Sequence, residues 1–136
     1  MSSMILAIDF DGTICEHRFP KIGKPAPRAF HWLKKFQEAE ALLILLTMRS
    51  DGRPDGNFLR DAVDFCRDNG VEFWQVNTNH EQDSWTSSRK VYAHAYIDDA
   101  AVGCPLIGEW GARVVDWDTV GPLVMKMIEQ RHGTSS

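Results

Sequence analysis

The sequence predicts an α/β fold with a mainly parallel central sheet of about five strands and helices on both of its faces. Short apolar runs alternate with longer segments in which apolar residues recur at helical spacing. The chain has 136 residues, enough for one domain with a hydrophobic core and too few for two. We therefore expect a single three-layer domain over residues 1–131, followed by a frayed tail over residues 132–136.

The strands are predicted from runs that are apolar along nearly their whole length, as strands buried on both faces are. In chain order these runs are Met4–Ile8, Leu42–Leu46, Val71–Val76, Tyr92–Ile97 and the short Arg113–Val115. The polar segment 77–89 has no such pattern, and we expect a loop there.

The predicted helices are Pro27–Ala39, Asn57–Asn69 and Val120–Met127. In the first, Ala29, Leu33 and Phe36 fall on one helical face. The second ends at Asn69-Gly70, a common helix stop. Helices and strands thus alternate, which indicates parallel strands joined by crossover helices.

Composition and charge exclude several classes of protein. Hydrophobic residues make up 43% and charged residues 25%, which is ordinary for a globular protein. The net charge of −4 gives no overall field that attracts nucleic acid. No apolar run approaches the roughly 20 residues of a membrane span, and residues 1–3 do not begin a secretory signal. Three widely spaced cysteines fit neither a disulfide framework nor a zinc site, so we expect a cytoplasmic protein.

Two carboxylates follow the first predicted strand directly. Asp9 and Asp11 are separated by one residue and are followed by Gly12. Ligands of open α/β sheets bind at the carboxyl ends of the strands. Paired acids there can hold a hard cation such as Mg²⁺, and a carboxylate can also attack phosphorus to form an acyl phosphate.

Other strands also end in polar residues. Thr47 and Arg49 follow the second strand, Asp98-Asp99 follows the fourth, and Lys90 precedes the fourth. Phosphoryl transfer needs this set: a nucleophile, a cation and a lysine that absorb charge on the phosphoryl oxygens, and a hydroxyl that positions them.

The stretch Asp9–Thr13 resembles the first motif of the haloacid dehalogenase (HAD) superfamily of phosphohydrolases. The other motifs of that superfamily follow in its order, with Thr47 ending a strand, Lys90 ahead of the last motif, and Asp98-Asp99 ending another strand. The resemblance spans roughly residues 4–105 and implies a Rossmann-like, HAD-like fold. It implies a Mg²⁺-dependent phosphatase that acts on a phosphomonoester.

The resemblance also implies roles for single residues. Asp9 would be the nucleophile that becomes an aspartyl phosphate. Asp11 would be the general acid for the leaving group, then the base for water, and its backbone carbonyl would bind the metal. Thr47 would bind the phosphoryl oxygens, and Lys90 would pair with Asp9 and the phosphate. Asp99 is the expected carboxylate ligand of Mg²⁺.

Further assignments stay open at this stage. Asp98 would support Lys90 or the metal, and the choice between Asp98 and Asp99 as ligand is not fixed. Gly12 would permit a tight turn near the substrate phosphate. Arg49 would contact that phosphate or lie as a charge on a surface loop. Cys15 has no paired histidine pattern, so we expect a small core residue.

Many HAD proteins carry a cap domain, but the segments around Thr47 have no room for one. We therefore expect a small capless hydrolase whose open site takes a large phosphorylated substrate or is closed by a second subunit of a homo-oligomer. The segment Glu16–Gly23 resembles the flap of small HAD-type hydrolases, and its His17, Arg18 and Lys21 are candidates for contacting substrate.

Three alternatives remain. A signalling receiver domain also combines acids, a threonine, a lysine and Mg²⁺, but its phosphoacceptor ends the third strand, where this chain has Asn77. A non-catalytic HAD-like phosphate-binding protein would carry the same motifs. A nucleic-acid end phosphatase is a subtype of the main prediction, and the acidic charge of the chain weighs against it.

Overall fold

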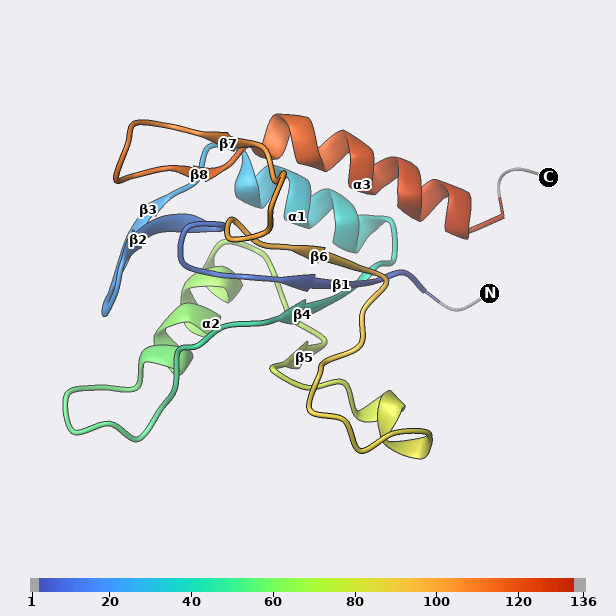
Figure 1. Cartoon of the computed structure of the whole chain (residues 1–136), viewed down its shortest axis with the longest axis horizontal. Coiled ribbons are helices and arrows are strands. Elements are labelled where there is room, and N and C mark those ends of the chain that lie inside the picture. The colour runs from blue at the N-terminus through green and yellow to red at the C-terminus, as the bar shows by residue number, and fades with distance from the viewer. Residues whose placement is uncertain (1–2, 134–136) are drawn as a thin grey trace.

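We describe the protein from a computed structural model, in which residues 3–133 are described. The centre of the molecule is a parallel four-stranded sheet in the order β5-β4-β1-β6 (Figure 1). Its strands are β1 (Ile5–Ile8), β4 (Leu42–Leu45), β5 (Gln75–Val76) and β6 (Ala95–Ile97). The predicted α/β class with a parallel sheet is confirmed, but the sheet has four strands and not about five.

The predicted fifth strand belongs to a separate hairpin. Val114–Val115 forms β8 and pairs antiparallel with β7 (Leu106–Ile107). Both valines are buried in the main core, which explains their apolar character. A buried pair has the same sequence pattern whichever strand it joins, so the pattern could not show which sheet it enters.

The three helices are α1 (Ala29–Glu38), α2 (Phe58–Asp68) and α3 (Trp117–Arg131), close to the predicted segments although α3 is longer at both ends. Each presents an apolar face, such as Ala29, Leu33 and Phe36 of α1. These faces pack in one core with Leu6 and Ile8, whose side chains share one side of β1.

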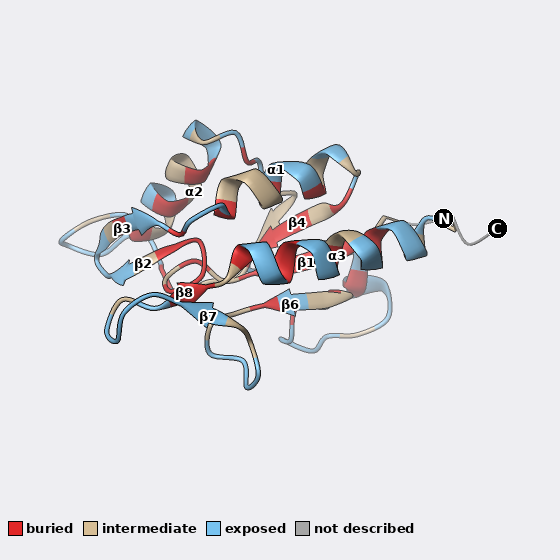
Figure 2. Ribbon diagram, turned by 90° about the horizontal axis from the view of Figure 1, so that it is seen from above, coloured by how far each residue is buried: buried red, intermediate tan, exposed pale blue. Residues whose placement is uncertain are grey.

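Helices on both faces were predicted, and this prediction is wrong for the described residues. Ile5, Ala7 and Ile44 on the other face pack against Val91 and Ala93 instead. These two residues belong to the long connection between β5 and β6, which contains only a short 3₁₀-helix, η1 (His80–Ser84) (Figures 1 and 2). The segment 77–89 lacks helical apolar spacing, so the face is covered by a loop.

That connection is held in shape by one buried amide. Gln82 donates through Nε2 to the carbonyls of Ser88 (3.2 Å) and Lys90 (2.9 Å), and its Oε1 accepts from the Tyr92 N–H at 2.9 Å. These bonds satisfy the backbone groups of a segment that no regular element pairs.

The loop after β1 leads into an antiparallel hairpin, β2 (Cys15–Arg18) and β3 (Lys21–Pro25), which is the predicted flap (Figure 1). No cap domain occurs in residues 3–133. None of the helices in this range has the length and apolar character that a membrane span requires. The predicted tail lies outside the described residues from position 134 onwards, while His132 and Gly133 close α3 with backbone hydrogen bonds.

Candidate active site

The site lies where the order of the strands reverses. From β1 the chain moves through β4 to β5 on one side of the sheet and then returns to β6 on the other side of β1. Asp9 follows β1, and its N–H donates to the carbonyl of Ile97 at 2.9 Å. Asp98 and Asp99 directly follow β6. Parallel sheets bind ligands at such a reversal, outside the carboxyl ends of the strands.

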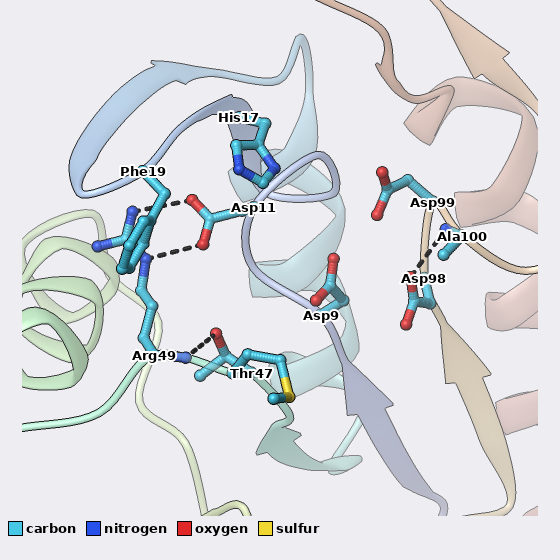
Figure 3. Close-up of a pocket in the computed structure, with 10 residues that line it drawn as sticks. Asp9, Asp11, His17, Phe19, Thr47, Arg49, Asp98, Asp99 and Ala100 are labelled. Carbon is cyan, nitrogen blue, oxygen red and sulfur yellow. Dashed lines mark hydrogen bonds and ion pairs between the residues drawn. The ribbon is translucent and has the colours of Figure 1, made fainter.

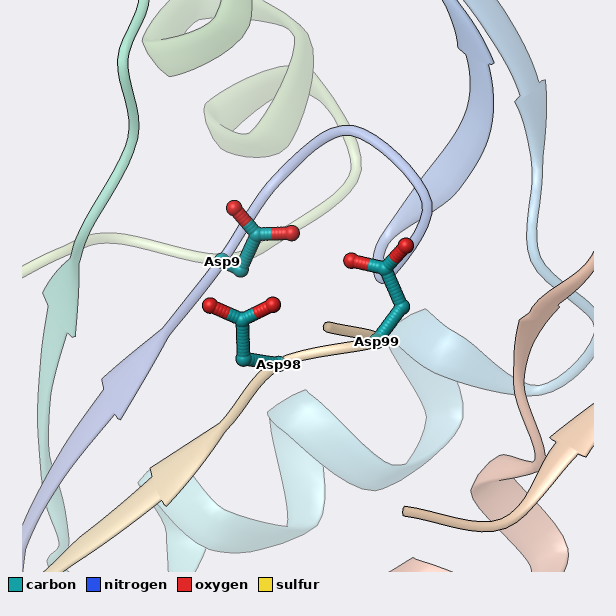
Figure 4. A group of neighbouring side chains, drawn as sticks. All are labelled: Asp9, Asp98 and Asp99. Carbon is teal, nitrogen blue, oxygen red and sulfur yellow. The ribbon is translucent and has the colours of Figure 1, made fainter. Parts of the chain in front are cut away.

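Three carboxylates meet at this edge of the sheet, as Figure 4 shows. One oxygen each of Asp9, Asp98 and Asp99 lies within 4.8 Å of the others. The three side chains are half-buried. We call this group the acidic triad.

Thr13 joins two members of the acidic triad. Its buried hydroxyl lies 2.9 Å from Asp9 Oδ2 and 3.3 Å from Asp99 Oδ1, and it accepts the Asp99 N–H at 3.1 Å. The carbonyl of Thr13 accepts a hydrogen bond from the indole Nε1 of Trp117 at 2.8 Å, so α3 holds this loop. Sequence reasoning did not assign Thr13 to the site, although a hydroxyl directly after Gly12 was the available signal.

Gly12 serves the same loop. Its φ of +85° favours glycine, and a Cβ there would overlap the carboxylate of Asp99. Its N–H donates to the carbonyl of Cys15 at 2.8 Å, and Gly12 does not line the pocket. Gly12 therefore makes room for Asp99 and permits the tight turn that was expected, and its place near a substrate phosphate stays a prediction.

The acidic triad is electrostatically crowded. Burial raises the pKa of Asp9 to about 8, helped by a hydrogen bond with Asp99 and by the negative charges of Asp98 and Asp99, while Thr13 lowers it. A hard divalent cation takes oxygen ligands and would offset these like charges. The donor set of the acidic triad therefore fits Mg²⁺.

Asp11 lies apart from the acidic triad, although it was predicted as a metal ligand. Figure 3 shows its carboxylate turned toward Arg49, with Oδ2 2.8 Å from Nε and Oδ1 2.8 Å from Nη2. This paired geometry is the strongest form of an arginine–carboxylate contact. The expected metal contact through the backbone carbonyl of Asp11 stays a prediction.

Arg49 is fully engaged within the protein, and its side chain is 1% exposed. Besides Asp11, it donates through Nη1 to the carbonyl of Pro20 at 3.1 Å and to that of Phe58 at 3.4 Å, and through Nη2 to that of Lys21 at 2.9 Å. All five of its N–H groups thus have acceptors. No N–H remains for a substrate phosphate, so the predicted contact of Arg49 with substrate does not fit this structure.

These residues surround a pocket of about 510 Å³. The residues that line it are Asp9, Asp11, His17, Phe19, Thr47, Met48, Arg49, Asp98, Asp99 and Ala100. Thr47 is present as predicted, and its Oγ1 accepts the Arg49 N–H at 3.2 Å. Exposed Phe19 and Met48 give the rim an apolar character.

Lys90 is not brought to this pocket. Its Nζ lies 5.6 Å from the ring centroid of Tyr96, and the residue lines a different pocket. The cause is the connection between β5 and β6, which covers one face of the sheet and carries Lys90 with it. Cys15 is buried in the core as expected, and burial raises the pKa of its thiol to about 11, which disfavours the thiolate form that a nucleophile needs.

No family model and no curated protein matches this sequence. Among solved structures, the chain is similar to the conserved protein coded by a locus of Bacteroides thetaiotaomicron, at 34% identity over 93% of each chain and with a TM-score of 0.74. That description names no activity. On this identity and coverage, the chain belongs to the same family as the conserved Bacteroides protein.

Proposed function

We propose that this protein is a Mg²⁺-dependent phosphatase of the HAD type, which hydrolyses a phosphomonoester through an aspartyl phosphate on Asp9. The observation that supports this most is the acidic triad at the edge where the strand order reverses. Carboxylates that crowd together without a cation are hard to explain as a purely structural feature.

Asp9 is the best nucleophile among the lining residues. It ends the central strand, faces the pocket, and is oriented by the Thr13 hydroxyl at 2.9 Å. A carboxylate can attack phosphorus to form an acyl phosphate, and it is released again when water attacks the phosphorus. Asp98 and Asp99 would hold Mg²⁺ together with Asp9, and the ion would supply positive charge for the phosphoryl oxygens. Thr47 remains available at the same pocket to bind those oxygens.

The strand order supports a Rossmann-like fold over a receiver domain. Numbered along the chain, the strands of the central sheet lie in the order 3-2-1-4. This is the beginning of the Rossmann order, whereas receiver domains have the order 2-1-3-4-5. The third strand, β5, is followed by Asn77, whose Oδ1 accepts the Thr47 N–H at 2.8 Å, and not by an acid.

One observation favours a second candidate, a protein that binds phosphate without turnover. Lys90 lies outside the pocket and Arg49 is engaged, so no lining Lys or Arg of the described residues is free to bind phosphate.

A cytoplasmic location, a large substrate and closure of the pocket by a second copy stay part of the proposal.

A screen for phosphate release tests the function. Purified protein would be given sugar phosphates, nucleotides, nucleic acids with phosphorylated ends and 4-nitrophenyl phosphate, with Mg²⁺ or with a chelator. We expect release that requires Mg²⁺. Saturable binding of these compounds without release would favour the second candidate, and a long-lived phosphoprotein after treatment with acetyl phosphate would favour a receiver domain.

A further inference from the structure

The pocket offers its ligand negative side chains and no free Lys or Arg. Three of its lining residues are the carboxylates of the acidic triad. Arg49 is the one lining Lys or Arg within residues 3–133, and its N–H groups are engaged inside the protein. A second anionic group on a substrate would therefore meet like charges there and no positive side chain to offset them. We expect the part of the substrate beyond the phosphoryl group to be uncharged.

Phe19 gives the pocket an aromatic wall. It lines the pocket, and 48% of the residue is exposed. The Cζ atom of Arg49 lies over its ring, 5.2 Å from the centroid, and the ring of Phe58 packs edge-on with the centroids 5.4 Å apart. The guanidinium and α2 thus hold the ring in place, while nearly half of the residue stays open. A ring held in this way gains free energy when a second aromatic ring packs against its open side.

Shielding of Arg49 explains only part of this arrangement. The guanidinium also lies over the ring of Phe10, 5.0 Å from its centroid, and the Arg49 side chain is 1% exposed. Phe10 is completely buried, as a residue that only shields is expected to be, whereas Phe19 is exposed at the pocket. The fold leaves the open side of Phe19 unused, and the pocket is where a ligand could cover it.

This aromatic wall lies on the side of the pocket that a leaving group would enter. Asp11 contacts Arg49 at 2.8 Å, and Arg49 in turn contacts Phe19. In the view of Figure 3, these three residues lie across from Asp98 and Asp99. In-line attack on a phosphoryl group held by the acidic triad directs the leaving group away from the nucleophile, toward the rim. Phe19 belongs to that rim.

Met48 adds a second apolar side chain to the rim. It follows Thr47 directly, lines the same pocket and is 98% exposed. The flexible side chain of methionine adapts to the shape of a ligand, and its sulfur makes favourable contacts with aromatic rings. The pocket volume of about 510 Å³ falls within the range of small-molecule sites. It leaves room for a phosphoryl group and an aromatic ring together.

We propose that the pocket selects phosphomonoesters with an uncharged, aromatic leaving group and that Phe19 determines this specificity. This inference rests on the proposed phosphatase function and names a substrate class for it. The ring of the leaving group packs against the open side of Phe19, and Met48 covers it from the rim. Sugar phosphates lack such a ring and substrates with a second phosphate add a charge, so both are poorer substrates.

The test compares benzyl phosphate with cyclohexylmethyl phosphate in the presence of Mg²⁺. The two esters release alcohols of similar size and acidity, so they differ mainly in the aromatic ring. We expect kcat/KM of the wild type to be about 5-fold higher for benzyl phosphate. Phe19→Leu keeps an apolar side chain but lacks the ring, so its kcat/KM should be similar for the two esters. Phe19→Tyr keeps the ring and should retain the preference.

A binding measurement gives a readout that does not depend on turnover. In 2-phenylethylphosphonate and 2-cyclohexylethylphosphonate, a carbon atom replaces the ester oxygen, so neither compound can be hydrolysed. Calorimetry with Mg²⁺ should show about 5-fold tighter binding of the phenyl compound to the wild type and equal binding of both to Phe19→Leu. Trp85→Leu is the matched control, because Trp85 is an exposed aromatic residue that does not line this pocket. It should keep the wild-type preference in both measurements.

The outcomes separate this inference from the function beneath it. Equal kcat/KM for the two esters in the wild type, or a preference for the benzyl ester that persists in Phe19→Leu, would overturn the role of Phe19. A higher kcat/KM for glucose 6-phosphate than for benzyl phosphate would overturn the substrate class. Absence of phosphate release from both esters and throughout the wider screen would instead overturn the proposed phosphatase, and the phosphonates would still show whether Phe19 selects an aromatic ligand. Melting curves would confirm that each variant is folded.

Discussion

Asp9 and Asp11 are two residues apart, yet they lie in opposite electrostatic surroundings. Asp9 is crowded by two further carboxylates, and its pKa is raised by burial. Asp11 is held by a buried guanidinium that contacts both of its oxygens. The comparison teaches that neighbouring acids in a motif need not share a task. Asp9 belongs to the acidic triad that we propose for chemistry and cation binding, whereas Asp11 is tied through Arg49 to a hairpin and a helix.

The largest expected effect is on catalysis at Asp9. Asp9→Asn should reduce phosphate release by roughly 1,000-fold or more, because an amide cannot replace a carboxylate as nucleophile. The melting temperature without Mg²⁺ should be unchanged or higher, since the variant removes one of three crowded carboxyl groups. Phosphate release and thermal melting measure the two effects.

The matched control for Asp9 is Asp68→Asn, which changes an exposed acid on α2 away from the pocket. This variant should retain full activity. Full activity in Asp9→Asn would show that the chemistry does not depend on the acidic triad in the way proposed.

The next largest effect is on stability at Arg49. Arg49→Met should lower the free energy of unfolding by about 3 kcal/mol, because it strands the carboxylate of Asp11 in a poorly solvated place. The double variant Arg49→Met with Asp11→Leu should recover part of that loss. Urea unfolding of the two single variants and the double variant gives the coupling. If the losses of unfolding free energy in the two single variants simply add in the double variant, the contact between Arg49 and Asp11 does not stabilise the fold.

Addition of Mg²⁺ should distinguish the acidic triad from Asp11 through a smaller effect, a shift in the melting temperature. Saturating Mg²⁺ should raise the melting temperature by a few degrees, because only the folded state gathers the acidic triad. Asp98→Asn and Asp99→Asn should each reduce this shift. Asp11→Asn should keep it, even though this variant starts from a lower melting temperature. Loss of the Mg²⁺-induced shift in melting temperature in Asp11→Asn would mean that Asp11 also takes part in binding the cation.

The smallest effect lies at the opposite end of β1. There the Ile5 N–H donates to Nδ1 of His94 at 2.8 Å, and burial followed by the charge of Arg131 lowers the pKa of this histidine. Because the folded state binds the proton less well than the unfolded state, stability should be full above about pH 6.5 and decline as the pH falls below it. Urea unfolding between pH 5 and pH 8 measures this dependence.

His94→Asn can accept the same hydrogen bond but does not titrate, so it should remove part of the pH dependence. His132→Asn, at the end of α3, should leave the pH dependence as it is in the wild type. Identical pH profiles for wild type and His94→Asn would mean that His94 does not couple protonation to folding.

The sequence was sufficient to predict where the strands end and which residues follow them. It was not sufficient to predict contacts between segments that lie far apart in the chain. The apolar run before Asp9 and the one before Asp98 predicted two strands, and parallel pairing brought their acids together. Thr47 was placed at the pocket by the same reasoning. These are local patterns followed by one rule of sheet topology.

The pairing of Arg49 with Asp11 could not be predicted in this way. It depends on where the hairpin turn and the start of α2 lie in space, since both supply acceptors to the guanidinium. Lys90 shows the same limit, because the path of the irregular connection after β5 decides its position. No periodicity encodes such a path.

The hydrogen bond from Trp117 to the carbonyl of Thr13 has a consequence for how the protein is made. The loop that follows Asp9, the nucleophile that we propose, leaves the ribosome early, but the indole that supports this loop belongs to α3 near the end of the chain. A nascent chain therefore has to release almost its entire length before this loop gains its support, and catalytic competence would arrive late in synthesis.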